Sequence, residues 1–166
     1  MVMKFKESDF GYYINWEKYE KGLKVTIPDS YKEMYEKLGA IGIDNYVYIA
    51  NIVESPSIFG LQEIMEYSKE CYNLLGGHLD EDAYTLKIGD KEDEWFPIGK
   101  TTNGDFIFVN DNQGVTILEG GFLGKEDYEC SLIEFINKYL NDDMKYEVLS
   151  EGLDGEEHEL TILAKE

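Results

Sequence analysis

The segment from Trp95 to Leu118 constrains the fold more than any other part of the chain. It contains three short runs that are rich in aromatic and β-branched residues, and the runs are separated by turn-forming residues. The runs are 95–98, 106–109 and 115–118, with turns at 103–104 and 110–114. This pattern predicts a three-stranded meander. Because both alternating faces of the middle run are apolar, we expect the middle strand to be covered on both sides and to form the centre of the sheet.

Apolar residues recur at helical spacing in segments on both sides of this meander. The segments predicted as helices are 14–22, ending at Gly22, then 28–38, ending at Gly39, then 61–75 and 131–140. Capping boxes are expected where Ser30 precedes Glu33 and where Ser131 precedes Glu134. Pro28 suits a first helical turn, where its missing N–H costs nothing.

The remaining segments give weaker signals. Residues 46–53 are β-branched and aromatic and predict a strand beside the meander. The glycine-containing segment 119–128 is expected to be irregular, and the runs at 146–149 and 160–163 form either a final hairpin or a helix-to-strand tail. A chain of 166 residues suits one domain with a sizeable core.

The charge balance narrows the choice of partners. The chain has 35 Asp and Glu against 15 Lys and Arg, a formal net charge of −20, and all of the cations are lysines. Without arginine, and with so negative a field, nucleic acid and anionic membranes are poor partners. The same field attracts cationic proteins, although acidity that serves only solubility is the commoner explanation.

Cysteine usage and hydropathy point to the cytoplasm. Cys71 and Cys130 are far apart in the sequence and form no Cys-x-x-Cys pair, which is typical of reduced thiols. No apolar run follows the first lysines, as a secretory signal would require, and no segment has the 18 or so apolar residues of a membrane span.

Two motifs resemble reactive sites, but their context favours ordinary structure. Gly99-Lys100-Thr101-Thr102 resembles the end of a phosphate-binding loop, yet the leading glycine position is Glu94, and Asn103-Gly104 turns the chain where a helix must begin. A hairpin turn is the better interpretation. With only His78 and His158 in the chain, no fixed metal site is expected, and no pair of carboxylates stands out for catalysis. We therefore predict no cofactor.

Several short motifs, in this order and spacing, resemble the SUKH superfamily of fungal cell-wall-synthesis regulators and bacterial toxin-immunity proteins. They are Ile27-Pro28-x-Ser30-Tyr31-Lys32 before a helix ending at Gly39, Trp95-Phe96-Pro97-Ile98-Gly99 followed by Gly104-Asp105, and Ser131-Leu132-x-x-Phe135-Ile136. The positions assigned a structural role in the family motifs are Pro28, Ser30, Tyr31, Trp95, Ile98, Gly99, Gly104 and Asp105.

The resemblance implies a single α+β domain with a central, mainly antiparallel sheet flanked by helices. Its core is at about 14–140, and an acidic C-terminal extension occupies 141–166. It also implies a non-catalytic immunity protein that binds and neutralises a cognate toxin, frequently a basic nuclease, inside the producing cell. The alternative is a general interaction or regulatory module on the same fold.

The densest negative charge lies between His78 and Glu94, in a segment predicted to be either a solvated loop or a docking rim. We expect the partner to contact its carboxylates, because loops held by a sheet often carry binding residues. These are Asp80, Glu81, Asp82, Glu92, Asp93 and Glu94.

Overall fold

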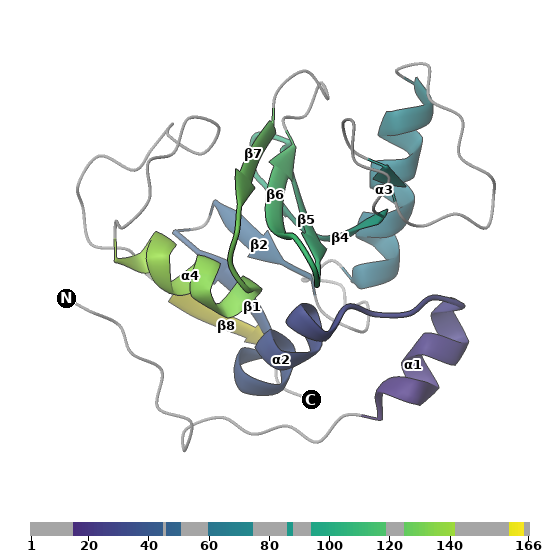
Figure 1. Cartoon of the computed structure of the whole chain (residues 1–166), viewed down its shortest axis with the longest axis horizontal. Helices are drawn as coiled ribbons and strands as arrows, with labels where there is room; N and C mark the ends of the chain where they lie inside the picture. The colour runs from purple at the N-terminus through teal and green to yellow at the C-terminus, as the bar shows by residue number, and fades with distance from the viewer. Residues whose placement is uncertain are drawn as a thin grey trace.

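The computed structural model in Figure 1 describes residues 15–44, 46–50, 60–74, 86–87, 94–118, 125–141 and 160–164. Its helices are α1 (Trp16–Leu23), α2 (Asp29–Leu38), α3 (Leu61–Leu74) and α4 (Leu132–Leu140). Its strands are β1 (Ala40–Ile43), β2 (Val47–Ile49), β3 (Leu86–Lys87), β4 (Glu94–Thr101), β5 (Phe106–Asn110), β6 (Gly114–Leu118), β7 (Lys125–Tyr128) and β8 (Leu160–Ala164). The protein is an α+β domain, as predicted.

The strands form one sheet in the order β7-β6-β5-β4-β2-β1-β8, and β3 pairs with β4 beside this path. Every described pairing is antiparallel. The predicted meander is confirmed as β4, β5 and β6, and residues 106–109 of β5 are all buried. The middle place in the strand order belongs to β4 instead of β5, because β2, β1 and β8 extend the sheet beyond β4.

Helices cover both faces of the sheet (Figure 1). The ring of Tyr67 in α3 packs on Phe106 at a centroid distance of 5.6 Å. On the opposite face, Phe135 of α4 packs on Tyr128 at 5.3 Å, and the strand register places Tyr128 beside Val115. Val115 pairs with Val109, which is three residues from Phe106 in β5 and therefore points to the opposite face of the sheet. Helix α3 thus covers one face and α4 covers the other. Helix α2 packs against α4.

The N-terminal helix α1 is attached to α2 by aromatic contacts. Trp16 meets Tyr31 and Tyr35 edge-on, at centroid distances of 6.2 and 5.8 Å, and its indole N–H donates to Glu36 at 2.7 Å. The prediction that Gly22 ends this helix is wrong. The helix continues through Gly22, and its end is formed by Lys24, which adopts a left-handed conformation with φ 57° and donates its N–H to the carbonyl of Glu20.

The structure also corrects the prediction for the start of α2. Pro28 is the N-cap, outside the first turn, and Ser30 forms no capping box with Glu33. In α4 the predicted capping box is confirmed. The Ser131 hydroxyl accepts from the amide of Glu134 at 3.2 Å, and the Glu134 carboxylate accepts from the amide of Ser131 at 3.1 Å.

Three strands were not predicted from sequence. β1 has only four residues, one of them glycine, and β3 only two, so neither gives a periodic signal. β7 is strand at 125–128, where irregular structure was expected. The strand predicted beside the meander is confirmed as β2, which pairs with β4. β8 lies in the predicted tail and pairs with β1, while residues 146–149 lie outside the described residues.

The Gly99–Thr102 segment is the end of β4 and the start of a hairpin turn, as interpreted from sequence. The Thr101 hydroxyl donates to the buried Asp105 carboxylate at 2.8 Å and accepts from the Asp105 amide at 3.2 Å. Gly104, with φ +88°, completes the turn. Trp95 and Ile98 lie on the same strand, β4, and are buried in the hydrophobic core.

The remaining motif residue of α2 is part of the core. Tyr31 is fully buried and its hydroxyl donates to the carbonyl of Ala50 at 2.7 Å. Burial, reinforced by the neighbouring Tyr35, raises the pKa of Tyr31 well above its ordinary value, so the phenol stays neutral. None of the helices in the described part of the chain is long and apolar enough to span a membrane.

Gly99 in β4 is predicted to tolerate no side chain without loss of stability. A Cβ at this position would lie 2.4 Å from the backbone oxygen of Tyr48, which belongs to the paired strand β2. Gly99→Ala should lower the free energy of unfolding by about 1–3 kcal/mol or more in urea titrations, because strand separation must increase. Gly22→Ala is the control. It meets no atom within 4 Å and lies inside a helix, so it should be neutral or stabilising. Equal effects of the two substitutions would contradict this account.

Candidate functional site

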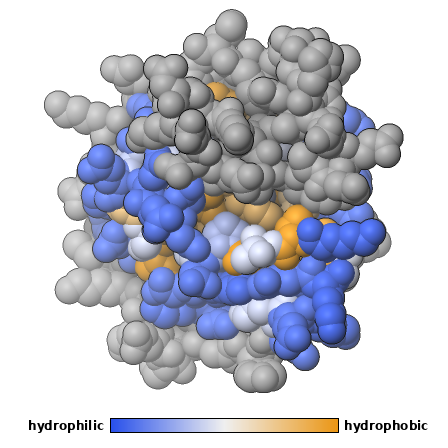
Figure 2. Space-filling view, turned by 45° about the vertical axis from the view of Figure 1, so that its right-hand side comes forward, coloured by the Kyte–Doolittle hydropathy of each residue, from blue (hydrophilic) through white to orange (hydrophobic). Residues whose placement is uncertain are grey.

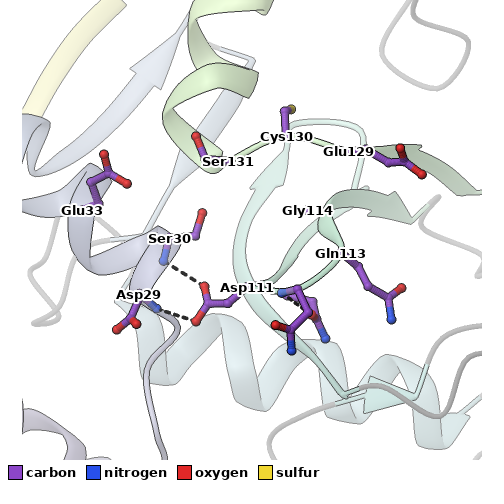
Figure 3. Close-up of a pocket in the computed structure, with 11 residues that line it drawn as sticks. Asp29, Ser30, Glu33, Asp111, Gln113, Gly114, Glu129, Cys130 and Ser131 are labelled. Carbon is purple, nitrogen blue, oxygen red and sulfur yellow. Dashed lines mark hydrogen bonds between the residues drawn. The ribbon is translucent and has the colours of Figure 1, made fainter.

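A polar groove opens where the starts of α2 and α4 meet the turn between β5 and β6 (Figure 3). Its volume is about 760 Å³. The residues that line it come from three stretches far apart in sequence, namely 29–33, 110–114 and 129–131. The tertiary fold therefore creates this groove, and no single sequence motif contains it.

The carboxylate of Asp111 holds the start of α2 in place. One of its oxygens accepts from the amide of Asp29 and the other from the amide of Ser30, both at 2.9 Å (Figure 3). The first amides of a helix lack partners within the helix, and Pro28, the N-cap, makes no side-chain cap bond. Asp111, which is 82 residues away from Asp29 in the chain, satisfies them instead and places negative charge at the positive end of the helix dipole.

Ser30 connects this first helix start to the second. Its hydroxyl accepts from the amide of Leu132, in the first turn of α4, at 2.9 Å. Ser131 and Glu134 satisfy further amides of the same turn through their capping box. The motif serine Ser30 thus caps the neighbouring helix instead of its own, and both helix starts are fixed relative to the β5–β6 turn.

A close backbone contact fixes the other wall of the groove. Gly114 has φ +114°, and a Cβ there would lie 2.1 Å from the oxygen of Tyr128 and 2.9 Å from the nitrogen of Cys130. Only glycine allows the turn to approach the 128–130 segment so closely. Burial raises the pKa of the Cys130 thiol; Lys138 lowers it and Glu134 raises it by smaller amounts. Cys130 is therefore a protonated thiol and a poor nucleophile.

The groove is negatively charged. Its described lining includes the carboxylates of Asp29, Glu33, Asp111 and Glu129 and no lysine, arginine or histidine. Glu33 pairs with Lys37 on its own helix at 3.4 Å, and Asp111 is engaged by the backbone of α2. Asp29 and Glu129 are exposed, and the Asp29 carboxylate lies 3.9 Å from the ammonium nitrogen of Lys32. This arrangement can attract and hold cationic groups.

The described residues of the groove provide carboxylates, amides, hydroxyls and one thiol. Across the described ranges, no group of three or more His, Cys, Asp or Glu side chains is arranged to hold a metal ion. The thiol of Cys130, which lines the groove, is protonated because burial raises its pKa. The carboxylates, amides and hydroxyls of this surface can bind cationic groups by charge and hydrogen bonding.

The carboxylates predicted to contact a partner lie mostly outside the described residues. Asp80, Glu81, Asp82, Glu92 and Asp93 are in this group. The backbone of Glu94 begins β4, where it pairs with Lys87 of β3. That these six carboxylates contact a partner stays a prediction. Sequence reasoning missed Asp111 and Glu129, because the Asn-Asp-Asn-Gln-Gly run at 110–114 predicts a turn but not the helix that the turn contacts.

The fold and the groove together define an α+β domain with an acidic groove between two helix starts. The family model of the SMI1 / KNR4 family (SUKH-1) matches residues 14–148, which is more than half of the chain. The protein belongs to this family, which includes toxin-immunity proteins. The predicted resemblance is confirmed. Searches among curated proteins and solved structures returned no match. Strand β8 (Leu160–Ala164) lies beyond the matched residues.

Replacement of Asp111 should destabilise the protein through the helix that it caps. Asp111→Ala leaves the amides of Asp29 and Ser30 without their acceptor, and we expect a loss of about 1–2 kcal/mol in the free energy of unfolding, measured by urea denaturation. Asn112→Ala is the matched control in the same turn. Its side chain is exposed, so its effect should stay within about 0.5 kcal/mol. If Asp111→Ala behaved like Asn112→Ala, the carboxylate would not be the cap of α2.

Proposed function

We propose that this protein is a non-catalytic cytoplasmic immunity protein that binds and neutralises a cognate polymorphic toxin, a basic protein such as a nuclease. The observation that carries the proposal is the groove in a member of the SMI1 / KNR4 family: its described lining has four carboxylates and no cation. A surface of this kind attracts a cationic protein segment and repels polyanions. Nucleic acid and anionic membranes are not partners in this proposal.

Long-range attraction supports the same conclusion. A net charge of −20 in a chain without arginine produces a field that speeds the encounter with a basic partner. The carboxylates of the 80–94 segment add to this field. In our proposal Asp80, Glu81, Asp82, Glu92, Asp93 and Glu94 contact the toxin in addition to the groove. Rapid association matters for immunity, because the toxin must be captured before it acts.

Neutralisation needs no chemistry on the toxin. A nuclease holds its substrate through a basic surface that contacts the phosphate backbone. An acidic protein that covers this surface competes directly with the nucleic acid, so inhibition follows from binding alone. This mechanism explains why a rigid fold with acidic surfaces is sufficient and why a reactive site is not required.

The proposal is tested by co-purification with the product of the neighbouring gene and by measurement of the dissociation constant at low and high salt. We expect tight binding that weakens as salt rises, because screening removes the long-range attraction. Binding to several unrelated proteins, but not to the neighbouring product, would favour a general interaction module of the same fold. No binding and no rescue of cells from the toxin would overturn the proposal.

The contribution of the groove is measured by neutralising its two exposed carboxylates. Asp29→Asn with Glu129→Gln should lower the association rate at low salt by about threefold to tenfold and leave the dissociation rate nearly unchanged. The matched control is Glu17→Gln with Glu36→Gln, which removes the same charge outside the groove. The second of these control substitutions keeps a side-chain oxygen that can accept from the indole N–H of Trp16. An equal effect of the two pairs would show that only total charge matters.

A further inference from the structure

Helix α3 has an exposed aromatic side chain that neither the core nor the groove explains. Tyr67 is 47% exposed and is the one exposed large hydrophobic side chain among the described residues. Figure 2 brings forward the side on which α1 and α3 lie in Figure 1, and there hydrophilic residues lie to the left, to the right and below a group of hydrophobic ones. An exposed tyrosine among polar residues is typical of the centre of a protein-binding surface.

The tyrosine is held in position before any partner arrives. One part of its ring packs on the buried Phe106 of β5 at a centroid distance of 5.6 Å. The helix that carries Tyr67 is anchored to the sheet by buried Leu61, Ile64 and Met65. A partner that covers the rest of the ring therefore gains contact area with little loss of side-chain entropy.

Acidic side chains surround Tyr67 on the same helix. Glu63, Glu66 and Glu70 are exposed and lie within about one helical turn of it. Glu66 accepts from Gln62 at 3.2 Å, whereas Glu63 and Glu70 have no hydrogen bond or ion pair to another described residue. Because both carboxylates are exposed, they face solvent, where a partner can reach them.

A cavity of about 340 Å³ lies beside the tyrosine. The described residues that line it are Tyr67, the three glutamates, Ile64 and Lys100 of β4. Three carboxylates against one lysine leave it net negative. Its chemistry fits an arginine or lysine side chain, with the aliphatic stem on apolar surface, the cation near the tyrosine ring and the N–H groups on carboxylates.

We propose that this α3 face, defined by Glu63, Glu66, Tyr67 and Glu70, is the anchoring surface for a basic segment of the partner protein. The inference rests on the proposed function and adds the surface that holds the partner after it has been attracted. The groove is lined by polar residues and one partly buried thiol, so it supplies charge but no large apolar contact. The two surfaces also lie on opposite faces of the sheet, since α3 covers one face and α4 the other.

The groove and the α3 face are distinguished by the rate that each affects, because substitutions in the groove should change association with the basic toxin and substitutions on the α3 face should change dissociation. Tyr67→Ala should raise the dissociation rate by about tenfold or more, with the association rate within about twofold of wild type, because a central aromatic contact acts after encounter. Tyr67→Phe is the matched control. It keeps the ring and should stay within about threefold of wild type. Glu63→Lys with Glu70→Lys, a change of exposed residues only, should abolish tight binding through like-charge repulsion.

The outcomes distinguish this inference from the proposed function. If the wild type binds the toxin and both Tyr67→Ala and the lysine pair bind equally well, the α3 face is not the anchor, and the proposed function stands. If the wild type does not bind the toxin, the proposed function and the inference about the α3 face are both wrong. Urea denaturation of each variant shows whether it is folded, and amide hydrogen exchange of the wild-type complex gives a readout without mutation. Protection of residues 62–70 on binding is expected, and its absence would overturn the inference.

Discussion

The hydrogen bonds from the start of α2 to the Asp111 carboxylate are the interaction on which the groove depends. They fasten a helix to a turn that is remote in sequence, and Ser30 extends the connection to the start of α4. Gly114 lets the same turn pack against the 128–130 backbone. Because each contact satisfies a backbone group or requires a close backbone approach, the three elements adopt one arrangement, and this arrangement brings the carboxylates of three remote stretches together.

Attraction and retention place different demands on a binding protein, and this molecule meets them with different surfaces in our proposals. Long-range attraction depends on the number of carboxylates, and exposed charges that face water contribute to it even without contact. Retention depends on a few contacts from which water is excluded. The groove is rich in carboxylates, and the α3 face combines an aromatic ring with carboxylates.

In this member of the SMI1 / KNR4 family, the residues that hold the fold together differ from the residues proposed for binding. The motif residues serve the fold: Tyr31 donates to Ala50, Asp105 closes the hairpin with Thr101, and Gly99 allows β2 to approach β4. None of these three motif residues needs to touch a partner. Asp29, Tyr67 and Glu129, which are proposed for binding, are exposed, and substitutions at such positions cost little stability, so one scaffold can present different partner surfaces.

Local sequence pattern is enough to predict the meander, the apolar face and capping box of α4, the hairpin at 103–104 and the strongly acidic charge. These are readable because alternation, helical spacing and turn residues act over a few neighbouring positions. The capping of α2 by Asp111, the capping of α4 by Ser30 and the pairing of β8 with β1 become visible only in the folded chain. Such pairings join residues far apart in the chain, and the partners carry no local signal of one another. The exposure of Tyr67 likewise depends on which side of α3 meets the sheet.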